Sequence, residues 1–213
     1  MIIAVDGSAA SGKGTLSKRL ATHFNLAHLD TGSLYRALAL QLLNDGQNTD
    51  NINKKQAIMA SNKLDLSLCN SPKIRTDRVA SAASKLAALT EVRANLIQLQ
   101  RNFANDPPHG NGAVLDGRDI GSVVMPKTPI KFFIDAKLEV RAERRYKELL
   151  HVGQSAMFRC VLDEMRERDQ RDRNRDVAPL RAANDAKTID TSIMDADQVF
   201  AVALGHVKQI TNI

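Results

Sequence analysis

A glycine-rich stretch near the amino terminus has the residue types and spacing to bind phosphate. It reads Gly7-Ser8-Ala9-Ala10-Ser11-Gly12-Lys13-Gly14-Thr15, and the spacing G-x-x-x-x-G-K lets successive backbone amides line a concavity, with Lys13 reaching the β- and γ-phosphates of a nucleotide. A simple glycine-rich turn is the alternative, but the stretch lies where a strand ends and a helix begins, which favours a phosphate loop. The hydroxyl expected directly after the lysine is replaced by Gly14, and Thr15 follows about 100° further around the helix. Ligation of Mg²⁺ by Thr15, directly or through water, is left open.

A second candidate is the segment Asp116-Gly117-Arg118-Asp119, which follows an apolar run. A carboxylate at the end of a strand beside a phosphate loop can hold Mg²⁺ or its waters, so Asp116 joins Thr15 as a tentative metal residue. Gly117 allows a close approach of backbone or ligand. The alternative is a tight turn with a local pair between Arg118 and Asp119.

A third candidate is the arginine-rich segment 168–175. Arg168 and Arg175 are two helical turns apart and project to one side, with Asp172 between them. The segment could equally be a solvated helix with i,i+4 pairs, which would be Glu164 with Arg168, Glu167 with Arg171, and Asp169 with Arg173. Downstream of a phosphate loop we favour cations gathered around phosphates, because an arginine in phosphoryl transfer is worth on the order of 10³ to 10⁵ in rate.

Hydrophobic patterning predicts the elements that would position these segments. Ile2–Val5 is a short β-branched run typical of a buried strand, and Leu16, Leu20 and Phe24 give the helix from Lys13 its apolar face. We expect further strands at Ala27–Leu29, Ala113–Leu115, Ile130–Ile134 and Ala186–Asp190, and further helices at Gly32–Leu43, Leu138–Leu150, Met157–Asp172 and Val199–Ile210. The alternation of strand and helix predicts an α/β fold with a five-stranded parallel sheet.

Residues from about 54 to 103 are mainly helical in pattern, with helices at Ala80–Leu89 and across Val92–Phe103, and show no strand of their own. They predict a helical insertion between strands. We therefore expect one domain, 1–213. Its core comprises about 1–35, 112–150 and 177–213, with an insertion at about 36–111 and a second helical excursion at about 151–176.

Composition narrows the function classes. The chain has 213 residues, 43% of them hydrophobic, which excludes disorder of the whole chain. Thirty Lys and Arg against twenty-four Asp and Glu leave a net charge of +6, which favours an anionic partner. Aromatic residues make up only 4% and Trp is absent, so platforms for stacking nucleic-acid bases are scarce. Two cysteines without metal-ligand spacing, and no secretion signal or spanning apolar run, predict a cytoplasmic protein.

The Gly-Lys-Gly-Thr ending of the phosphate loop resembles that of nucleoside monophosphate kinases. Three further segments look like the bacterial cytidylate kinase family, namely 29–36 (LDTGSLYR), 116–121 (DGRDIG) and 168–175 (RDQRDRNR). The resemblance covers nearly the whole chain. It implies a three-layer P-loop NTPase fold with a nucleoside-monophosphate-binding insertion (36–111) and a lid (151–176). It also implies transfer of the γ-phosphoryl group of MgATP to CMP or dCMP by a monomeric enzyme that binds neither nucleic acid nor membrane.

The resemblance also implies the roles of individual residues. It assigns catalysis to Lys13, Arg118, Arg168 and Arg175. It assigns ATP binding to Gly7, Ser8, Ala9, Ala10, Ser11, Gly12, Lys13, Gly14 and Thr15, and more weakly to Arg141 and Arg145 of the helix before the lid. It assigns CMP binding to Thr31, Tyr35, Arg36, Ser84, Arg93, Asp116, Gly117, Arg118, Asp119, Arg168, Asp172 and Arg175. Ser84 and Arg93 rest mainly on the resemblance, because alone they look like ordinary helix residues.

Two rival functions and one departure from the family pattern remain. A kinase of the same fold could use UMP, AMP or shikimate as acceptor, and a nucleic-acid-binding ATPase or regulator could use the basic charge. The second rival predicts a continuous basic stripe, whereas basic and acidic residues are interleaved here.

Many family members carry a longer, strand-containing segment between the counterparts of Leu66 and Arg75. Only about eight residues fill that gap here, so we expect the insertion's sheet to be reduced.

Overall fold

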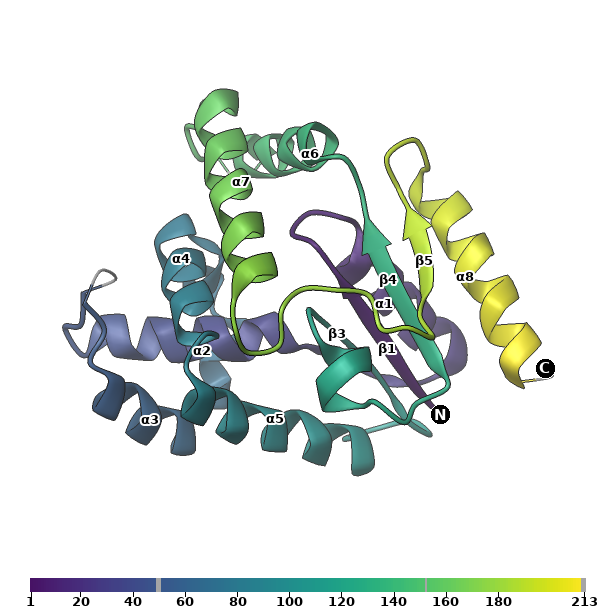
Figure 1. Cartoon of the computed structure of the whole chain (residues 1–213), viewed down its shortest axis with the longest axis horizontal. Helices are drawn as coiled ribbons and strands as arrows, with labels where there is room; N and C mark the ends of the chain where they lie inside the picture. Colours follow the sequence, from purple (N-terminus) through teal and green to yellow (C-terminus); the bar gives the residue numbers. More distant parts are fainter. Residues whose placement is uncertain (49–50, 152, 212–213) are drawn as a thin grey trace.

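A five-stranded parallel sheet forms the centre of the molecule in a computed structural model that describes residues 1–48, 51–151 and 153–211 (Figure 1). The strand order is β2-β3-β1-β4-β5. The strands are β1 (Ile2–Gly7), β2 (Ala27–Asp30), β3 (Ala113–Gly117), β4 (Ile130–Asp135) and β5 (Lys187–Asp190). All four pairings are parallel. The predicted five-stranded α/β fold is confirmed, and the strands extend one or two residues past most predicted ends because the pairing continues into the polar residues there.

The sheet is covered on both faces because side chains alternate along its strands. Ile3 and Val5 of β1 face a core shared with α1 (Lys13–Phe24) and α8 (Ala196–Thr211). Ala4 faces the other side, where it packs with Leu115 and Ile120. That second layer contains the carboxyl-terminal part of α5 (Thr90–Asn105) and a single wide turn, η3 (Ile120–Val124). The result is the expected three-layer arrangement.

The segment between β2 and β3 is a helical unit with a core of its own. It contains α2 (Thr31–Asn44), α3 (Lys54–Asn62), α4 (Asp77–Leu86), α5 and two 3₁₀ helices, η1 (Leu66–Asn70) and η2 (Pro72–Arg75). Its core includes Leu38, Leu86, Val92 and Leu96, all fully buried. No strand is assigned among its described residues. The short gap between Leu66 and Arg75 is thus filled by 3₁₀ turns. Residues 49 and 50 of the predicted insertion lie outside the described residues.

The boundary predicted for α4 was wrong by three residues at each end. The Thr76 side chain accepts a hydrogen bond from the Val79 backbone N–H at 3.4 Å, so the helix begins at Asp77 rather than Ala80. It ends at Leu86, and α5 starts at Thr90 in a new direction. The start of this helix is therefore set by the Thr76 cap, which lies three residues before the first buried apolar residue, Val79.

Two helices form a hairpin that rises above the carboxyl ends of the strands (Figure 1). These are α6 (Leu138–His151) and α7 (Phe158–Asn174), which pack through Ala142, Leu149, Val161 and Met165. In Figure 1, α7 runs between α6 and α4. The predicted lid, 151–176, therefore corresponds to α7 and the turn before it, of which Val152 lies outside the described residues. None of the described helices is long and apolar enough to cross a membrane.

Candidate functional site

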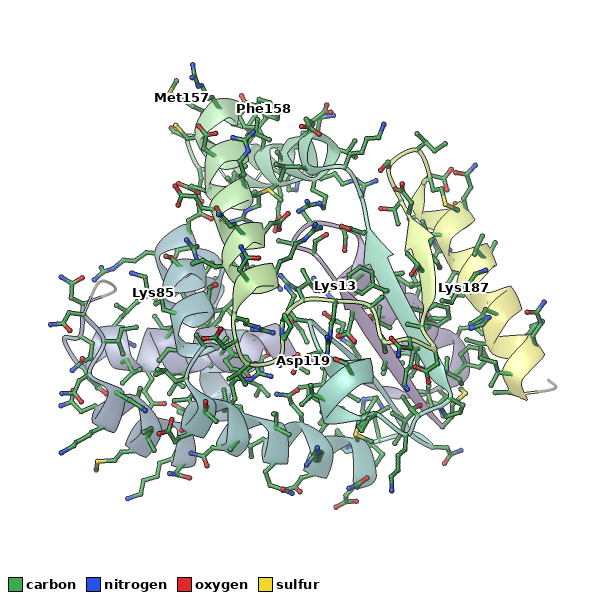
Figure 2. The ribbon with its side chains drawn as sticks, viewed as in Figure 1. Lys13, Lys85, Asp119, Met157, Phe158 and Lys187 are labelled. Atoms are coloured by element: carbon green, nitrogen blue, oxygen red, sulfur yellow. The ribbon has the colours of Figure 1, made fainter. Side chains whose placement is uncertain are left out.

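A cavity of about 930 Å³ lies where the phosphate loop, the helical insertion and α7 meet. Figure 2 shows Lys13 and Asp119 in this central region of the molecule. The structure brings most predicted site residues to its wall. These are Ala9, Ala10, Gly12, Lys13, Gly14, Thr15, Thr31, Tyr35, Arg36, Ser84, Arg93, Asp116, Gly117, Arg118, Asp119, Arg145, Arg168, Asp172 and Arg175. The cavity wall does not include Gly7, Ser8, Ser11 or Arg141.

The three buried loop residues that do not line the cavity shape the phosphate loop from behind. A Cβ on Gly7 would lie 2.0 Å from the Ile134 carbonyl oxygen, so only glycine allows β1 and β4 to approach this closely. Ser8 Oγ donates a hydrogen bond to the carboxylate of Asp135 at the end of β4. The Ser11 carbonyl accepts a hydrogen bond of 2.9 Å from Thr191 Oγ1, just past β5. The ends of β4 and β5 therefore hold the loop open before any ligand arrives.

Lys13 opens α1 and extends its side chain into the loop. Its Nζ donates a weak hydrogen bond to the Ser8 carbonyl at 3.3 Å. Burial and, to a lesser extent, the neighbouring positive charge of Arg118 lower the pKa of Lys13 from 10.5 to about 7, although Asp116 opposes this shift. An anion bound in the loop would favour the charged ammonium. The site is thus electrostatically incomplete without a negatively charged ligand.

The segment from Asp116 to Gly121 is held in place by Asp6, a residue that the sequence analysis did not single out. The two carboxylate oxygens of Asp6 accept hydrogen bonds from the backbone N–H groups of Ile120 and Gly121 at 2.7 and 2.8 Å. Asp6 is only 3% exposed, and this burial raises its pKa to about 7. An acidic residue inside an apolar strand was the sequence signal that could have identified it, because a buried carboxylate requires partners.

Gly117 fits the predicted need for a close approach. A Cβ at this position would lie 2.6 Å from Thr31 Oγ1 and 2.7 Å from the Ile120 side chain. Thr31 Oγ1 also donates a hydrogen bond of 2.8 Å to the Asp116 carbonyl. The end of β3 and the start of α2 are therefore fastened together where both face the cavity.

Arg168 of α7 and Arg175, which directly follows that helix, both line the cavity, as their spacing predicted. Arg118 Nε donates to Asp172 Oδ2 at 3.1 Å, whereas Arg168 Nε lies 4.0 Å from the same oxygen. Arg168 Nε and Arg175 Nη2 are buried, and neither atom has a hydrogen-bond partner among the described residues. Burial lowers the pKa of Arg168 to about 9, with the nearby Arg118 adding to the shift. Buried guanidinium donors without acceptors are costly, which indicates a site built for an anion.

Further acceptor residues implied by the resemblance line the same cavity and contact this cluster. Arg93 Nη2 forms a buried ion pair with Asp119, and Ser84 Oγ donates to Asp172 Oδ1 at 3.3 Å. Although burial alone raises the pKa of Asp172, Arg118 and Arg168 together hold it below its usual value. Asp119 and Asp172 therefore each hold arginine side chains in place at the cavity wall. Tyr35 and Arg36 of α2 line the same cavity, and burial raises the pKa of the tyrosine and lowers that of the arginine.

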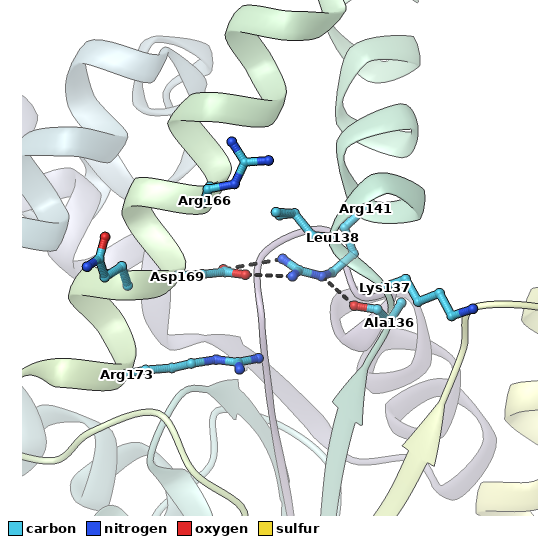
Figure 3. Close-up of a pocket in the computed structure, with 8 residues that line it drawn as sticks. Ala136, Lys137, Leu138, Arg141, Arg166, Asp169 and Arg173 are labelled. Atoms are coloured by element: carbon cyan, nitrogen blue, oxygen red, sulfur yellow. Dashed lines mark hydrogen bonds and ion pairs between the residues drawn. The ribbon is translucent and has the colours of Figure 1, made fainter.

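Arg141 lies outside the large cavity, in a smaller pocket of about 400 Å³ between α6 and α7 (Figure 3). Its side chain is 3% exposed, and Figure 3 shows the guanidinium bonded to both oxygens of Asp169 and to the Ala136 carbonyl. It also donates to the Ala9 carbonyl at 3.3 Å. Arg141 thereby joins the lid hairpin to the back of the phosphate loop.

Arg145 differs from Arg141 because it reaches across to the insertion. Its Nη2 lies 2.8 Å from Asp77 Oδ1 at the start of α4, and its Nη1 lies 3.1 Å from Glu148. Although burial opposes it, these two acidic partners raise the pKa of Arg145. The structure therefore places Arg145 as a contact between the lid hairpin and the insertion, on the cavity wall.

Of the i,i+4 pairs that the alternative, a solvated helix, would contain, one forms and another does not. Glu167 and Arg171 form the expected pair at 3.7 Å. Asp169 does not pair with Arg173, because Asp169 faces α6 and bonds to Arg141. Arg173 instead lies 3.3 Å from Asp135 of β4. Contacts with neighbouring elements displaced the local pairs, so α7 is not a simple solvated helix.

The two tentative metal residues line the same cavity. Asp116 has a side chain only 4% exposed, and its Oδ2 accepts a hydrogen bond of 2.7 Å from His28 Nε2. No group of three or more His, Cys, Asp or Glu residues that could hold a metal occurs in the described part of the chain. Mg²⁺ that travels with nucleotide phosphates uses one or two carboxylates together with phosphate oxygens and waters. The donor set of Asp116 and Thr15 fits a metal shared in this way.

Comparison with known proteins agrees with this geometry. A family model described as cytidylate kinase matches residues 3–209. The chain is 51% identical to a cytidylate kinase of Paramagnetospirillum magneticum over 206 residues, which cover 97% of each chain. It is 50% identical to that of Rhodospirillum rubrum, over 99% of this chain and all of the other. An uncharacterized protein of Eubacterium ventriosum shares the fold, with a TM-score of 0.53 at 14% identity and 98% of each chain covered.

Proposed function

The chain belongs to the cytidylate kinase family, an ATP-dependent family that converts CMP or dCMP to CDP or dCDP, and we propose that the cavity of about 930 Å³ is its active site. One observation supports this placement above the others. The buried Arg168 Nε and Arg175 Nη2 lack acceptors among the described residues, and Lys13 faces the same space. A triphosphate and a monophosphate would supply the missing negative charge.

The two substrates approach from opposite walls. The phosphate loop, residues 7–15, holds the triphosphate of ATP through backbone amides at the start of α1. Thr31, Tyr35, Arg36, Ser84, Arg93 and the residues from Asp116 to Asp119 bind the CMP or dCMP side, together with Arg168, Asp172 and Arg175 of the lid. The insertion, 36–111, and the lid, 151–176, act as the flaps that close over the substrates. Such a closure would use two contacts between the insertion and the lid hairpin, which are Ser84 with Asp172 and Asp77 with Arg145.

The transfer is direct and in line: a phosphate oxygen of CMP attacks the γ-phosphorus of ATP while the bond from that phosphorus to the β,γ-bridging oxygen breaks, and ADP leaves. That oxygen is already anionic near neutral pH, so no general base is needed. Lys13, Arg118, Arg168 and Arg175 stabilise the charge of the transferred group, and their fixed placement contributes because the site does not reorganise during the reaction. Positioning of the two phosphates is worth up to about 7 to 11 kcal/mol. The closed flaps keep water from intercepting the phosphoryl group.

Asp116 and Thr15 would hold the Mg²⁺ that accompanies ATP, directly or through water. When bound, the metal neutralises charge on the β- and γ-phosphates. Asp116 is well suited to this role because its carboxylate lies at the wall beside Lys13, whose positive charge it offsets. We also propose that the enzyme acts as a monomer, as the resemblance to the family implies.

A pair of lysine variants tests the proposal. Lys13→Met should lower kcat by at least 10³-fold, because it removes a cation from the transferring phosphate. Lys147→Met is the matched control, since Lys147 lies on the outside of α6 with a 70% exposed side chain and pairs with Glu143. Its kcat should stay within about twofold of the parent enzyme, which is the scale of a lost surface pair. Near-normal turnover in a folded Lys13→Met variant would overturn the assignment of the site.

The acceptor is tested in a coupled ADP-release assay with ATP fixed and CMP, dCMP, UMP or AMP varied. We expect CMP and dCMP to have the highest kcat/KM. A preference for AMP or UMP would contradict the substrate assignment while leaving the phosphate loop intact. Tight, salt-sensitive RNA binding without acceptor-dependent ADP release would instead favour the nucleic-acid-binding rival.

A further inference from the structure

His28 lines the cavity wall beside Asp116, and the roles assigned above do not include it. His28 Nε2 lies 2.7 Å from Asp116 Oδ2, and the two side chains are 19% and 4% exposed. In the parallel pairing of β2 and β3, His28 lies opposite Val114 and Asp30 opposite Asp116. Because side chains alternate along a strand, His28 and Asp116 share the face of Val114, which packs in the same core as α1. The phosphate loop and Lys13 lie at the start of that helix.

The contact fixes the orientation of the Asp116 carboxylate. The terminal torsion of an aspartate is broad, so a carboxylate at a cavity wall can turn unless a partner holds it. An ionised carboxylate only accepts hydrogen bonds, so His28 Nε2 is the donor. Thr31 holds the Asp116 backbone at the same time, through its carbonyl. No hydrogen bond from a described residue ends on Oδ1, which leaves that oxygen for a ligand in the cavity.

We propose that His28 is a positioning residue, which holds Oδ2 of Asp116 so that Oδ1 faces the Mg²⁺, or a metal-bound water, that accompanies ATP. This inference rests on the proposed function of the cavity. Residues that hydrogen-bond to a metal-ligating carboxylate set its orientation and basicity, and their loss typically costs about 10- to 100-fold in metal affinity or activity. The effect of His28 passes through Asp116.

Two substitutions separate this role from simple packing. His28→Phe keeps a ring at the position but removes the donor, whereas His28→Gln keeps an N–H donor near the place of Nε2. His109→Leu is the control, because His109 is exposed in the loop before β3. The affinity of each variant for a non-transferable β,γ-imido analogue of ATP is measured by calorimetry, once with Mn²⁺ and once with a chelator. The ratio of the two affinities is the metal advantage.

We expect His28→Phe to reduce the metal advantage by about 10-fold while the metal-free affinity stays within about twofold, because the ATP analogue depends on the orientation of Asp116 only through the metal. The kcat with CMP should fall by a similar factor. His28→Gln should recover most of the metal advantage. The control should match the parent protein in both measurements.

An unchanged metal advantage in folded His28→Phe would overturn the inference, even if its thermal midpoint fell, because a purely structural pair predicts only that fall. Should His28→Phe not fold, His28→Gln carries the test together with Asp116→Asn. The Gln variant must then keep a metal advantage that the Asn variant loses, and equal loss in both would overturn the inference. A parent protein that binds the analogue neither with nor without metal would refute the proposed function, a result distinct from a defect confined to His28 variants.

Discussion

Replacing Asp6 with asparagine should change how the stability of the enzyme depends on pH. Asp6 is 3% exposed and accepts two backbone N–H groups, and burial raises its pKa from 3.8 to about 7. Between those two values the folded protein keeps a proton that the unfolded chain has released. Unfolding therefore releases a proton in this window, so the contribution of Asp6 to stability is greatest at low pH and falls as pH rises through the window.

The size of the effect follows from the two pKa values. A change from 3.8 to about 7 corresponds to about 4 kcal/mol across the whole window, of which about 3 kcal/mol falls between pH 5 and pH 8. Asp6→Asn cannot titrate, so its free energy of unfolding should lack this fall. The stability of the variant relative to the parent should then improve by about 3 kcal/mol on going from pH 5 to pH 8, whatever the difference at pH 5.

Urea unfolding followed by far-ultraviolet circular dichroism at pH 5, 6, 7 and 8 measures this difference, since the chain has no tryptophan for fluorescence. Asp195→Asn is a matched control. Asp195 Oδ1 also accepts two backbone N–H groups, at 2.8 and 2.9 Å, but Asp195 is exposed at the start of α8. The free energy of unfolding of Asp195→Asn should differ from that of the parent by nearly the same amount at all four pH values. The account of Asp6 as a buried residue that retains its proton would be refuted if the free energy of unfolding of Asp6→Asn, relative to that of the parent, stayed constant or fell as the pH rises.

Two further predictions concern the cavity wall. Gly117→Ala should raise the KM for CMP by about 10-fold and lower the free energy of unfolding by about 1 to 3 kcal/mol. The reason is that the new Cβ would lie 2.6 Å from Thr31 Oγ1 and force the segment to shift. Steady-state kinetics and urea unfolding measure the two effects, and an unchanged KM would contradict the prediction. Arg168→Met should lower kcat by at least 10³-fold yet leave the thermal midpoint of the ligand-free enzyme unchanged or higher, because the buried guanidinium has an unpartnered donor there. A large fall in that midpoint would show that Arg168 stabilises the empty protein.

The sequence was sufficient for the fold because the fold depends on local patterns. Short runs between helical patterns predicted all five strands, and the helix expected from about Lys13 to Phe24 is α1. The phosphate loop was predictable for the same reason, since its residues are consecutive. The two-turn spacing of Arg168 and Arg175 likewise predicted a shared direction, which the unpartnered donors of both residues now support.

Contacts across the sheet and between helices were beyond this reasoning. The sequence offered Asp169 only a local partner four residues away, as part of the solvated-helix alternative, whereas α6 places Arg141 against it. His28 appeared to be one polar residue in a short strand, because its partner Asp116 is 88 positions away and meets it only through the register of β2 and β3. Asp6 and its partners Ile120 and Gly121 are separated in the same way. The residues missed are those that orient the site from behind.

The placement of the charges explains why such orienting contacts are needed. Residues 141–181 contain eleven basic and eight acidic residues, so half of the net charge of +6 lies in this one segment. Within the cavity, Asp116, Asp119 and Asp172 separate cations that would otherwise repel, and the pKa values of Lys13 and Arg168 are still lowered to about 7 and 9. This residual repulsion is relieved only when anionic substrates enter. The ligand-free enzyme therefore holds its cations in a costly arrangement, and substrate binding should stabilise the folded state by the amount that mass action and this relief together allow.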